Sequence, residues 1–387
     1  MKQVVFFDTT LRDGQQQAGI RFSPDEKVRL AHQLASLGVN IVETGFTIAS
    51  EEDFHSAKRI SQEVDGIVVC SLARVLHDDI QKTAQALEHA RNPPRIHTFI
   101  ATSDIHLEHK LCMSRTQALD AAVSAVECAR SYVDDVQFSA EDATRSDFGY
   151  LASVVREVIL AGARTVNLPD TVGYCMPQDI QQMIVRMHAE VPEIAEYGVV
   201  ISVHCHDDLG CAVANTLAGI SAGARQVECT INGIGERAGN THYAPVAMAL
   251  TTREDFFGMQ HTLRTQKIGN TSRLVSEITS KKVSDNFPVV GMHAFAHASG
   301  IHAHGSLRHQ ETYQIMTPAS VGWEGEQYPL SLQSGKTGLA QRLERVGYVV
   351  GENEMPSVYQ AFLVRASEVS LLDDTDLHAL MRAVRGS

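Results

Sequence analysis

The chain alternates short apolar runs with longer amphipathic stretches over roughly its first 260 residues. The apolar runs have four to six residues each, which is typical of buried strands, and the stretches between them follow the helical period. Eight such runs occur, at Val4–Phe7, Ile41–Gly45, Ile67–Leu72, Ile96–Ile100, Val133–Phe138, Thr165–Leu168, Val199–Val203 and Gln226–Ile231. Eight buried strands, each followed by a helix, predict an α/β fold that is either a closed parallel barrel or an open doubly wound sheet.

The first amphipathic stretch carries clear helix-end signals. Ser23 precedes Pro24, and Glu26 follows three residues after the serine. Serine is a favoured N-cap, proline suits the first helical position, and glutamate at the third closes a capping box. Gly38 follows Leu37 and suits the left-handed residue that ends a helix. The pattern predicts a helix from Pro24 to Leu37.

Three segments begin with a helix-ending glycine and place a polar residue five positions later, at Glu43, Asn167 and Glu228. Each of these residues falls at or near the carboxyl end of a predicted strand. One such residue could belong to a structural ion pair, but three at the same depth favour a shared polar cavity. In a barrel this is the end at which active sites are built.

The alternation of strands and helices stops after about residue 260. Residues 267–284 are polar and helix-like, residues 293–309 are rich in histidine and glycine, and residues 340–385 are helical in pattern. We therefore expect a barrel domain over residues 1–268 and a mostly helical lid region over residues 269–387.

Composition narrows the class of function. The net charge of −13 makes nucleic-acid binding improbable, because an acidic chain repels phosphate backbones. The seven cysteines form no C-x-x-C pair and are odd in number, which does not fit a disulfide framework. No apolar run approaches 18 residues and no signal peptide opens the chain, so we expect a cytoplasmic protein without a membrane span.

The strongest chemical signal is the segment His204-Cys205-His206 at the end of the seventh predicted strand. Residues two apart in a strand face the same side, so both imidazoles should point into the barrel while Cys205 points toward the helices. Two converging imidazoles are typical of a divalent metal site. A pair of hydrogen-bonded core histidines is the alternative.

A site with two imidazoles needs an oxygen ligand to balance its charge. The first predicted strand ends near Asp8 and Asp13, and position alone does not choose between them. Arg12 lies beside Asp13 and is suited to oppose negative charge on an oxygen during enolate chemistry.

Three further segments carry weaker signals. The glycine-rich loop 232–240 lacks the dinucleotide-binding spacing, so it predicts either a phosphate site or tight turning. The segment 334–338 looks like a phosphate-binding loop, but Leu330 stands where that loop requires glycine. The histidines of the region 293–309 match no compact metal-binding spacing and favour acid–base residues on a lid.

Several of these segments resemble the α-isopropylmalate synthase and homocitrate synthase family. The matching motifs are Phe7-Asp8-Thr9-Thr10-Leu11-Arg12-Asp13-Gly14-Gln15-Gln16, Ser71-Leu72-Ala73-Arg74, Ile96-His97-Thr98-Phe99-Ile100-Ala101-Thr102-Ser103, Asn167-Leu168-Pro169-Asp170-Thr171-Val172-Gly173, His204-Cys205-His206-Asp207-Asp208-Leu209-Gly210, Asn232 to Asn240, and Ser299-Gly300-Ile301-His302. The resemblance covers nearly the whole chain. It implies a (β/α)8 TIM barrel whose enzyme condenses acetyl-CoA with a 2-oxo acid and then hydrolyses the thioester. For an isopropylmalate synthase the acid is 3-methyl-2-oxobutanoate, in leucine biosynthesis.

The resemblance also assigns roles to residues. It implies the metal ligands Asp13, His204, His206 and Asn240, and the catalytic residues Arg12, Glu141, His302 and Tyr313. It implies an oxo-acid pocket formed by Glu43, Leu72, His97, Ser139 and Thr171. The metal would be Mn, Zn, Mg or Co. His302 and Tyr313 would reach over the barrel from the helical region, often from a partner subunit, which predicts a homodimer.

The sequence also departs from the family. The chain stops before a leucine-binding domain could form, so we expect no inhibition by leucine. The stretches 15–19 and 44–47, and His304 where the family commonly has aspartate, leave the oxo acid open, with homocitrate-type or citramalate-type condensation as alternatives. A metal-dependent lyase on the same barrel and a non-catalytic homologue are the remaining hypotheses.

Overall fold

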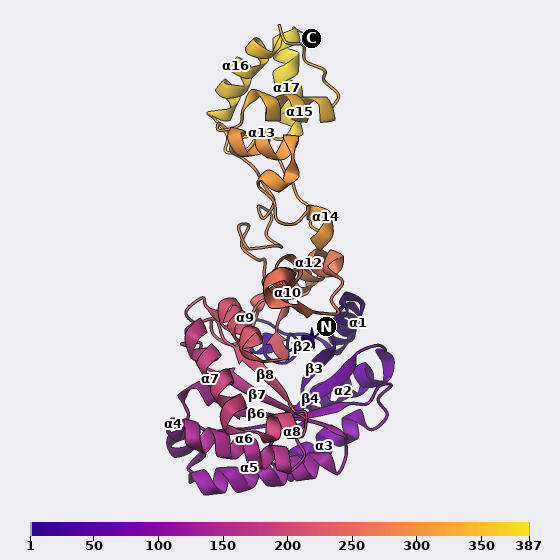
Figure 1. Cartoon of the computed structure of the whole chain (residues 1–387). Helices are drawn as coiled ribbons and strands as arrows, with labels where there is room; N and C mark the ends of the chain where they lie inside the picture. The colour runs from indigo at the N-terminus through magenta and orange to yellow at the C-terminus, as the bar shows by residue number, and fades with distance from the viewer. Residues whose placement is uncertain (1, 387) are drawn as a thin grey trace. The chain divides into compact units, whose positions relative to one another are not determined.

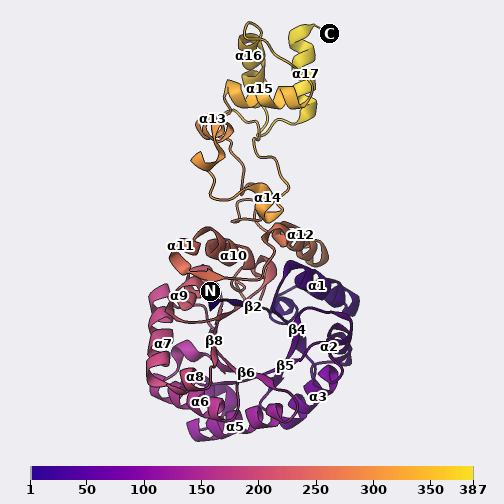
Figure 2. The same cartoon turned by 45° about the vertical axis from the view of Figure 1, so that its right-hand side comes forward.

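The computed structural model describes residues 2–386 and contains a closed barrel of parallel strands. The strands pair in chain order, and the last pairs with the first, which excludes the open sheet (Figure 2). They are β2 (Val5–Asp8), β3 (Ile41–Phe46), β4 (Val68–Arg74), β5 (Arg95–Ala101), β6 (Asp135–Glu141), β7 (Thr165–Asp170), β8 (Val200–Cys205) and β9 (Gln226–Cys229). Each of the eight predicted strands is confirmed.

Helices form a ring around these strands (Figures 1 and 2). The major ones are α1 (Pro24–Leu37), α2 (Glu51–Glu63), α3 (His77–Leu87), α5 (Arg115–Arg130), α6 (Phe148–Leu160), α7 (Pro177–Glu190), α9 (Ala212–Ala222) and α10 (Tyr243–Thr252). Short helices α4 (Asp104–His106), α8 (Glu193–Glu196) and α11 (Glu254–Phe257) and a π-helical turn at Leu107–Leu111 lie in the connections. A two-residue strand β1 (Lys2–Gln3) pairs with β10 (Met259–Gln260) outside the barrel, and it is too short to give an apolar run.

The end signals of α1 operate as predicted. The Ser23 side chain accepts from the backbone N–H of Glu26, and the Glu26 carboxylate accepts from the backbone N–H of Ser23. Gly38 ends the helix in the left-handed conformation at φ 91°. A Cβ there would collide with the carbonyl oxygen of Thr262, so the position needs glycine for two reasons.

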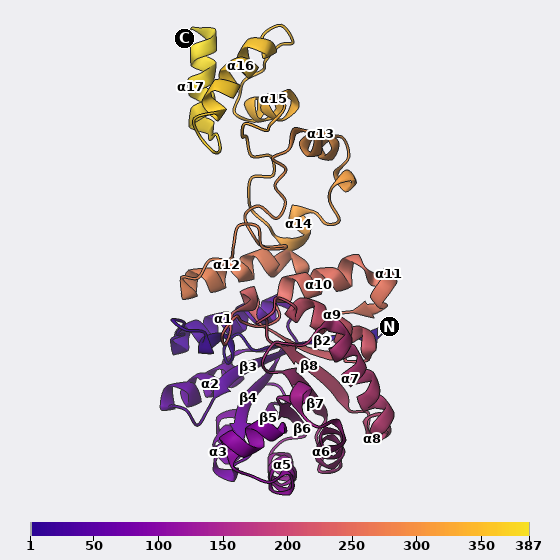
Figure 3. The ribbon, with the colours of Figure 1, turned by 90° about the vertical axis from the view of Figure 1, so that its left-hand side faces the viewer.

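The chain divides into two compact units, one up to Lys282 and one from Val283. The helix α12 (Ile268–Thr279) belongs to the first unit, where it lies beside α1 (Figure 3). The domain boundary expected after residue 268 lies at the first residue of α12, whereas the first compact unit extends through this helix to Lys282. A polar helical pattern does not reveal the surface on which a helix packs.

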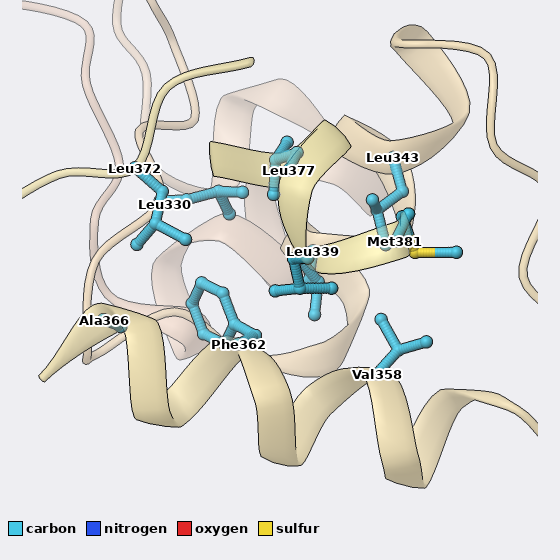
Figure 4. Packing of buried hydrophobic residues seen from close by; sticks show 10 residues of the cluster. Leu330, Leu339, Leu343, Val358, Phe362, Ala366, Leu372, Leu377 and Met381 are labelled. Atoms are coloured by element: carbon cyan, nitrogen blue, oxygen red, sulfur yellow. The ribbon is translucent and has the colours of Figure 1, made fainter. Parts of the chain in front are cut away.

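The second unit is mostly helical. It contains α13 (Gly300–Arg308), α14 (Pro318–Val321), α15 (Lys336–Arg345), α16 (Met355–Ala366) and α17 (Asp374–Arg385). Its buried core is apolar and includes Leu339, Phe362 and Leu377 (Figure 4). Among residues 2–386, no helix is both long enough and apolar enough to cross a membrane.

Candidate metal centre and active site

The barrel register brings the polar strand ends together. His204 on β8 lies opposite Glu228 on β9, and β9 pairs in turn with β2. Asp13 follows β2 in the connecting loop, and the backbone of Asn240, after β9, forms a bridge with His206. Residues more than 220 positions apart in the chain therefore meet at the carboxyl end of the barrel.

Asp13, His204 and His206 form a buried group whose ligand atoms lie within 4.8 Å of one another. The two Nε2 atoms are 3.2 Å apart, and they lie 3.7 and 3.9 Å from Asp13 Oδ2. Asn240 Nδ2 donates to Asp13 Oδ1 at 2.7 Å, while its own buried Oδ1 has no hydrogen-bond partner among the described residues. The four predicted ligands are thus together.

The hydrogen-bond directions at these residues suit a divalent cation. His206 Nδ1 lies 3.3 Å from the carbonyl oxygen of Gly239, which can only accept, so the proton belongs on Nδ1. His204 Nδ1 lies 3.0 Å from Glu228 Oε2. The two Nε2 atoms face each other 3.2 Å apart beside the Asp13 carboxylate, and a cation bound there would accept a lone pair from each. The orphaned Asn240 Oδ1 supplies a further neutral oxygen.

The electrostatic surroundings favour the protonation states that ligands need. Burial raises the pKa of Asp13, but the charges of Arg12, His204 and His206 and the Asn240 hydrogen bond outweigh it and hold that pKa well below its usual range. Burial, with the neighbouring His204, lowers the pKa of His206 to about 4. At neutral pH the carboxyl group is therefore ionised and the His206 imidazole is neutral.

Asp8 plays a different part from Asp13. Its oxygens accept from the backbone N–H and the hydroxyl of Thr10 at 2.9 and 3.0 Å, away from the metal-ligand group. Burial outweighs these hydrogen bonds and raises the pKa of Asp8 to about 7. The structure thus separates the two aspartates that position alone left open.

The glycine-rich loop packs tightly against the centre. A Cβ at Gly235 would collide with the Asn240 amide and lie 2.7 Å from Asp13 Oδ1. The N–H of Glu236 donates to the same Asp13 oxygen at 3.2 Å. These contacts fit the tight-turning interpretation of the loop, because its glycines allow backbone to approach the ligand side chains.

A chain of hydrogen bonds runs around the barrel wall beside the metal centre. Arg12 Nε donates to Glu43 Oε2 at 2.6 Å, and Glu43 Oε1 lies 2.6 Å from His97 Nδ1. His97 Nε2 lies 2.6 Å from Ser139 Oγ, which also accepts from Asn167 Nδ2 at 3.0 Å. Burial raises the pKa of Glu43, but Arg12 and then His97 outweigh it, so the pKa is lowered. The wall is therefore a fixed and polarised surface.

A cavity of about 340 Å³ lies over this wall. Nine predicted site residues line it, namely Arg12, Asp13, Leu72, His97, Ser139, Glu141, Thr171, His204 and His206. Glu43 contacts Arg12 and His97 as described, and Asn240 contacts Asp13. Of the three polar residues predicted to share a cavity, Asn167 and Glu228 line it, whereas Glu43 lies behind it in the hydrogen-bonded wall.

Sequence reasoning missed other lining residues. Phe46 and Phe99 join Leu72 in an apolar part of the lining, and Lys110 donates to Glu141 at 2.6 Å. Arg237 pairs with Asp208 at 2.8 Å at the rim. Phe99 lies in the predicted strand 96–100 and Phe46 directly follows the predicted strand 41–45, so their place near the carboxyl ends of strands could have identified both. Lys110 lies on the π-helical turn and carried no signal.

A second trio in the barrel, Glu43, Cys70 and His97, also has metal-ligand spacing. The Glu43 oxygens are already taken by Arg12 and His97, and burial raises the pKa of the Cys70 thiol. We interpret this trio as part of the hydrogen-bonded wall.

His302 and Tyr313 belong to the second unit. Their rings stack with centroids 4.1 Å apart, and the His297 ring lies 6.5 Å from that of His302. His297 also stacks on Tyr328 at 6.0 Å. The two predicted acid–base residues are thus neighbours within an aromatic cluster, and no metal-ligand trio is found among the described residues of this unit.

The fold and the site together define a parallel α/β barrel with a cation-binding group at its carboxyl end. The model of the HMGL-like family matches residues 3–275, and the model described as homocitrate synthase post-HMGL domain-like matches residues 289–369. Among solved structures, hydroxymethylglutaryl-CoA lyase from Pseudomonas aeruginosa has a TM-score of 0.62 and 21% identity, covering 73% of this chain and 94% of that one. At this identity the likeness shows the fold alone.

Curated relatives are much nearer in sequence. The 2-isopropylmalate synthase of Syntrophus aciditrophicus (strain SB) is 49% identical over 380 residues, covering 98% of this chain and 73% of that protein. The same enzyme of Aquifex aeolicus (strain VF5) is 49% identical over 381 residues, with the same coverage. The chain belongs to the HMGL-like family and, within it, to the 2-isopropylmalate synthases.

Proposed function

We propose that this protein is an acyltransferase that condenses acetyl-CoA with 3-methyl-2-oxobutanoate to give 2-isopropylmalate and CoA, a reaction of leucine biosynthesis. The observation that carries the proposal is the identity of nearly half of all positions with 2-isopropylmalate synthases over 98% of the chain. The metal-ligand group beneath a cavity with both apolar and polar walls supports it.

Asp13, His204, His206 and Asn240 would hold a divalent cation, which when bound acts as a Lewis acid on the oxo group. Mn, Zn, Mg and Co each suit two imidazoles, a carboxylate and an amide oxygen. Arg12 is fixed between Glu43 and Asp13 and stabilises the negative charge that develops on the oxo oxygen.

The remaining wall binds and orients the oxo acid. Thr171 Oγ accepts from the backbone N–H of Asp142 at 2.9 Å, so its own hydroxyl hydrogen is free to donate to the substrate carboxylate. Leu72, Phe46 and Phe99 offer the apolar surface on which an isopropyl group excludes water.

Proton transfer at the acetyl methyl group requires an acid–base group near the thioester. We assign it to His302 and Tyr313 of the second unit, acting on the barrel of a partner subunit in a homodimer, with Glu141 as a further catalytic carboxylate. Removal of the methyl proton lets the methyl carbon bond to the oxo carbon, whose oxygen then takes up a proton. Water cleaves the thioester and releases CoA thiol.

The direct test is release of free CoA thiol from acetyl-CoA with pyruvate, 2-oxobutanoate, 3-methyl-2-oxobutanoate or 2-oxoglutarate. We expect turnover with 3-methyl-2-oxobutanoate, lost with a chelator and in His204→Ala, and retained in the matched variant His89→Ala at an exposed histidine after α3. Preference for pyruvate or 2-oxoglutarate would reassign the substrate. No turnover with any of the four acids would overturn the synthase assignment.

A further inference from the structure

The barrel interior beneath the metal centre is polar, whereas the interior layers of such barrels are usually filled by branched apolar side chains. Arg95 on β5, Gln137 on β6, and Gln226 and Glu228 on β9 are all buried there. Burying this many polar groups is unfavourable unless each has a partner of the right kind. The hydrogen bonds among these four residues have a single consistent direction.

Arg95 sets that direction. Its Nε donates to Asp135 Oδ2 at 2.9 Å, and its Nη1 donates to Gln137 Oε1 at 2.9 Å and to Gln226 Oε1 at 2.7 Å. A guanidinium group has donors only, so both glutamine side chains must turn their oxygens toward it. Gln226 Nε2 then donates to Gln137 Oε1 at 2.8 Å, which holds the same orientation from a second side.

The amide nitrogen of Gln137 consequently faces the metal side of the barrel. It donates to Glu228 Oε1 at 2.6 Å and lies 3.4 Å from His97 Nε2. A flipped amide would place its oxygen against the Glu228 carboxylate and its nitrogen against Arg95, so the flipped orientation is excluded. The other Glu228 oxygen, Oε2, lies 3.0 Å from His204 Nδ1, close enough for an electrostatic contact, although the two atoms do not form a hydrogen bond.

We infer that Arg95, Gln137 and Glu228 form a positioning relay in which the Glu228 charge, 3.0 Å from His204 Nδ1, favours the proton on that nitrogen and so leaves the Nε2 lone pair for the cation. Arg95 orients Gln137, Gln137 holds one Glu228 oxygen, and the other Glu228 oxygen faces the imidazole. The relay rests on the metal centre of the proposed function and adds three residues that act on the cation only through His204. Such outer contacts fix the tautomer and orientation of a ligand histidine.

Exchanging the side chains at positions 137 and 228 tests whether these residues orient His204 or only fill space in the barrel interior. In Glu228→Gln, the new side chain can turn its amide oxygen toward His204 only by turning its amide nitrogen toward the Gln137 amide nitrogen. Arg95 holds the Gln137 amide in place, so the two nitrogens would oppose each other. The opposite orientation places a donor against His204 Nδ1. In the double variant Gln137→Glu/Glu228→Gln, the carboxylate at position 137 faces Arg95 and accepts from the new amide nitrogen, so the amide oxygen at position 228 can face His204 again.

The experiment measures Mn²⁺ binding to the metal-free full chain by electron paramagnetic resonance, without substrate. We expect about 10–100-fold weaker binding for Glu228→Gln and recovery to within a few-fold of wild type in the swap. Ser202→Ala is the matched control, because Ser202 Oγ contacts Gln226 Nε2 at 3.1 Å in the same layer but not the relay. Its binding should match wild type.

Wild-type affinity in Glu228→Gln, or a swap no better than that single variant, would overturn the relay. If Glu228→Gln does not fold, as judged by thermal unfolding, the swap alone decides by the same criterion. Absence of Mn²⁺ binding by the wild type would overturn the metal centre itself and the relay with it. CoA release that persists in a swap variant with weak Mn²⁺ binding would overturn the relay while leaving the proposed reaction standing.

Discussion

The barrel unit and the helical unit bury different kinds of side chain. The barrel encloses charged groups such as Asp13, Glu43 and Arg95, each with a partner. The core of the second unit is apolar, and among its described residues, 283–386, the buried polar ones are Ser306 and Ser334. The second unit carries its ion pairs and its predicted acid–base residues nearer the surface.

This difference means that substitutions in the barrel interior and in the helical core should affect different properties of the protein. Buried ionised groups cost free energy unless they are paired, so the barrel interior is specified by hydrogen-bond partners and tolerates little change. An apolar core is specified mainly by volume and shape. Loss of a metal-ligand carboxylate should therefore remove activity, whereas loss of a core side chain in the helical unit should chiefly remove stability.

The largest effect is expected for Asp13→Asn. Removing the anionic ligand should lower the rate of CoA release by about 1,000-fold or more, since a bound cation contributes several kcal/mol to the transition state. Mn²⁺ binding should fall with it. Asp8→Asn is the matched control, an equally buried carboxyl outside the ligand group, and it should keep Mn²⁺ binding. Equal losses in both variants would contradict the assignment of Asp13.

Phe362→Ala tests the helical unit. The ring is fully buried in the apolar core, so its removal should lower the free energy of unfolding of this unit by about 3–5 kcal/mol. Chemical denaturation should show this loss while Mn²⁺ binding by the barrel persists. Val364→Ala, an exposed position on the same helix, is the matched control. Loss of Mn²⁺ binding together with the helical unit would show that the two units do not separate as argued.

Tyr313→Phe tests whether the helical unit carries chemistry. Deleting the hydroxyl should lower the rate of CoA release by about 100-fold, the lower range for loss of an acid–base group, without changing Mn²⁺ affinity. Tyr359→Phe removes a different hydroxyl of the same unit, one that donates to the Ser334 carbonyl, and should leave the rate unchanged. Similar rates in both variants would remove Tyr313 from the proposed mechanism.

The smallest effect concerns the pH dependence of stability. Because burial raises the pKa of Asp8 to about 7, the folded state keeps a proton that the unfolded state releases near pH 4. The free energy of unfolding therefore falls as pH rises toward 7, by about 2 kcal/mol between pH 5.5 and 8, and it stays at the lower value at higher pH. Denaturation of the metal-free protein at both pH values should show this loss, and Asp8→Asn should lack it. An identical pH dependence in the variant would rule out Asp8 as its source.

The pattern of apolar runs predicted all eight strands, because buried strands have a clear apolar signal, but it left a closed barrel and an open sheet as alternatives; the family resemblance implied the barrel that the structure contains. Strand alternation also placed His204 and His206 on the inner face, and the structure brings both to one point. Asp13 could not be separated from Asp8 by position, since the choice depends on how the loop after β2 turns. Asn240 came only from the family resemblance, because a loop residue has no periodicity that predicts where it points.

Other features depend on contacts that no local pattern encodes. Gln137 lies in a predicted strand and Arg95 directly precedes one, and only closure of the barrel places Gln226 beside them. Lys110 reaches Glu141 because a π-helical turn carries it there. The end of the barrel unit depends on α12 packing beside α1, which is a property of two surfaces.

The loop packing at Gly235 has a consequence for directed evolution. Any side chain there would displace Asn240 and Asp13 together, so a library that randomises residues 232–240 should return glycine at this position in every active clone. Phe46, Leu72 and Phe99 line the same cavity, but their side chains take no part in the hydrogen-bonded wall. Libraries meant to retarget the enzyme to a longer or shorter oxo acid should therefore vary these three positions and keep the loop constant.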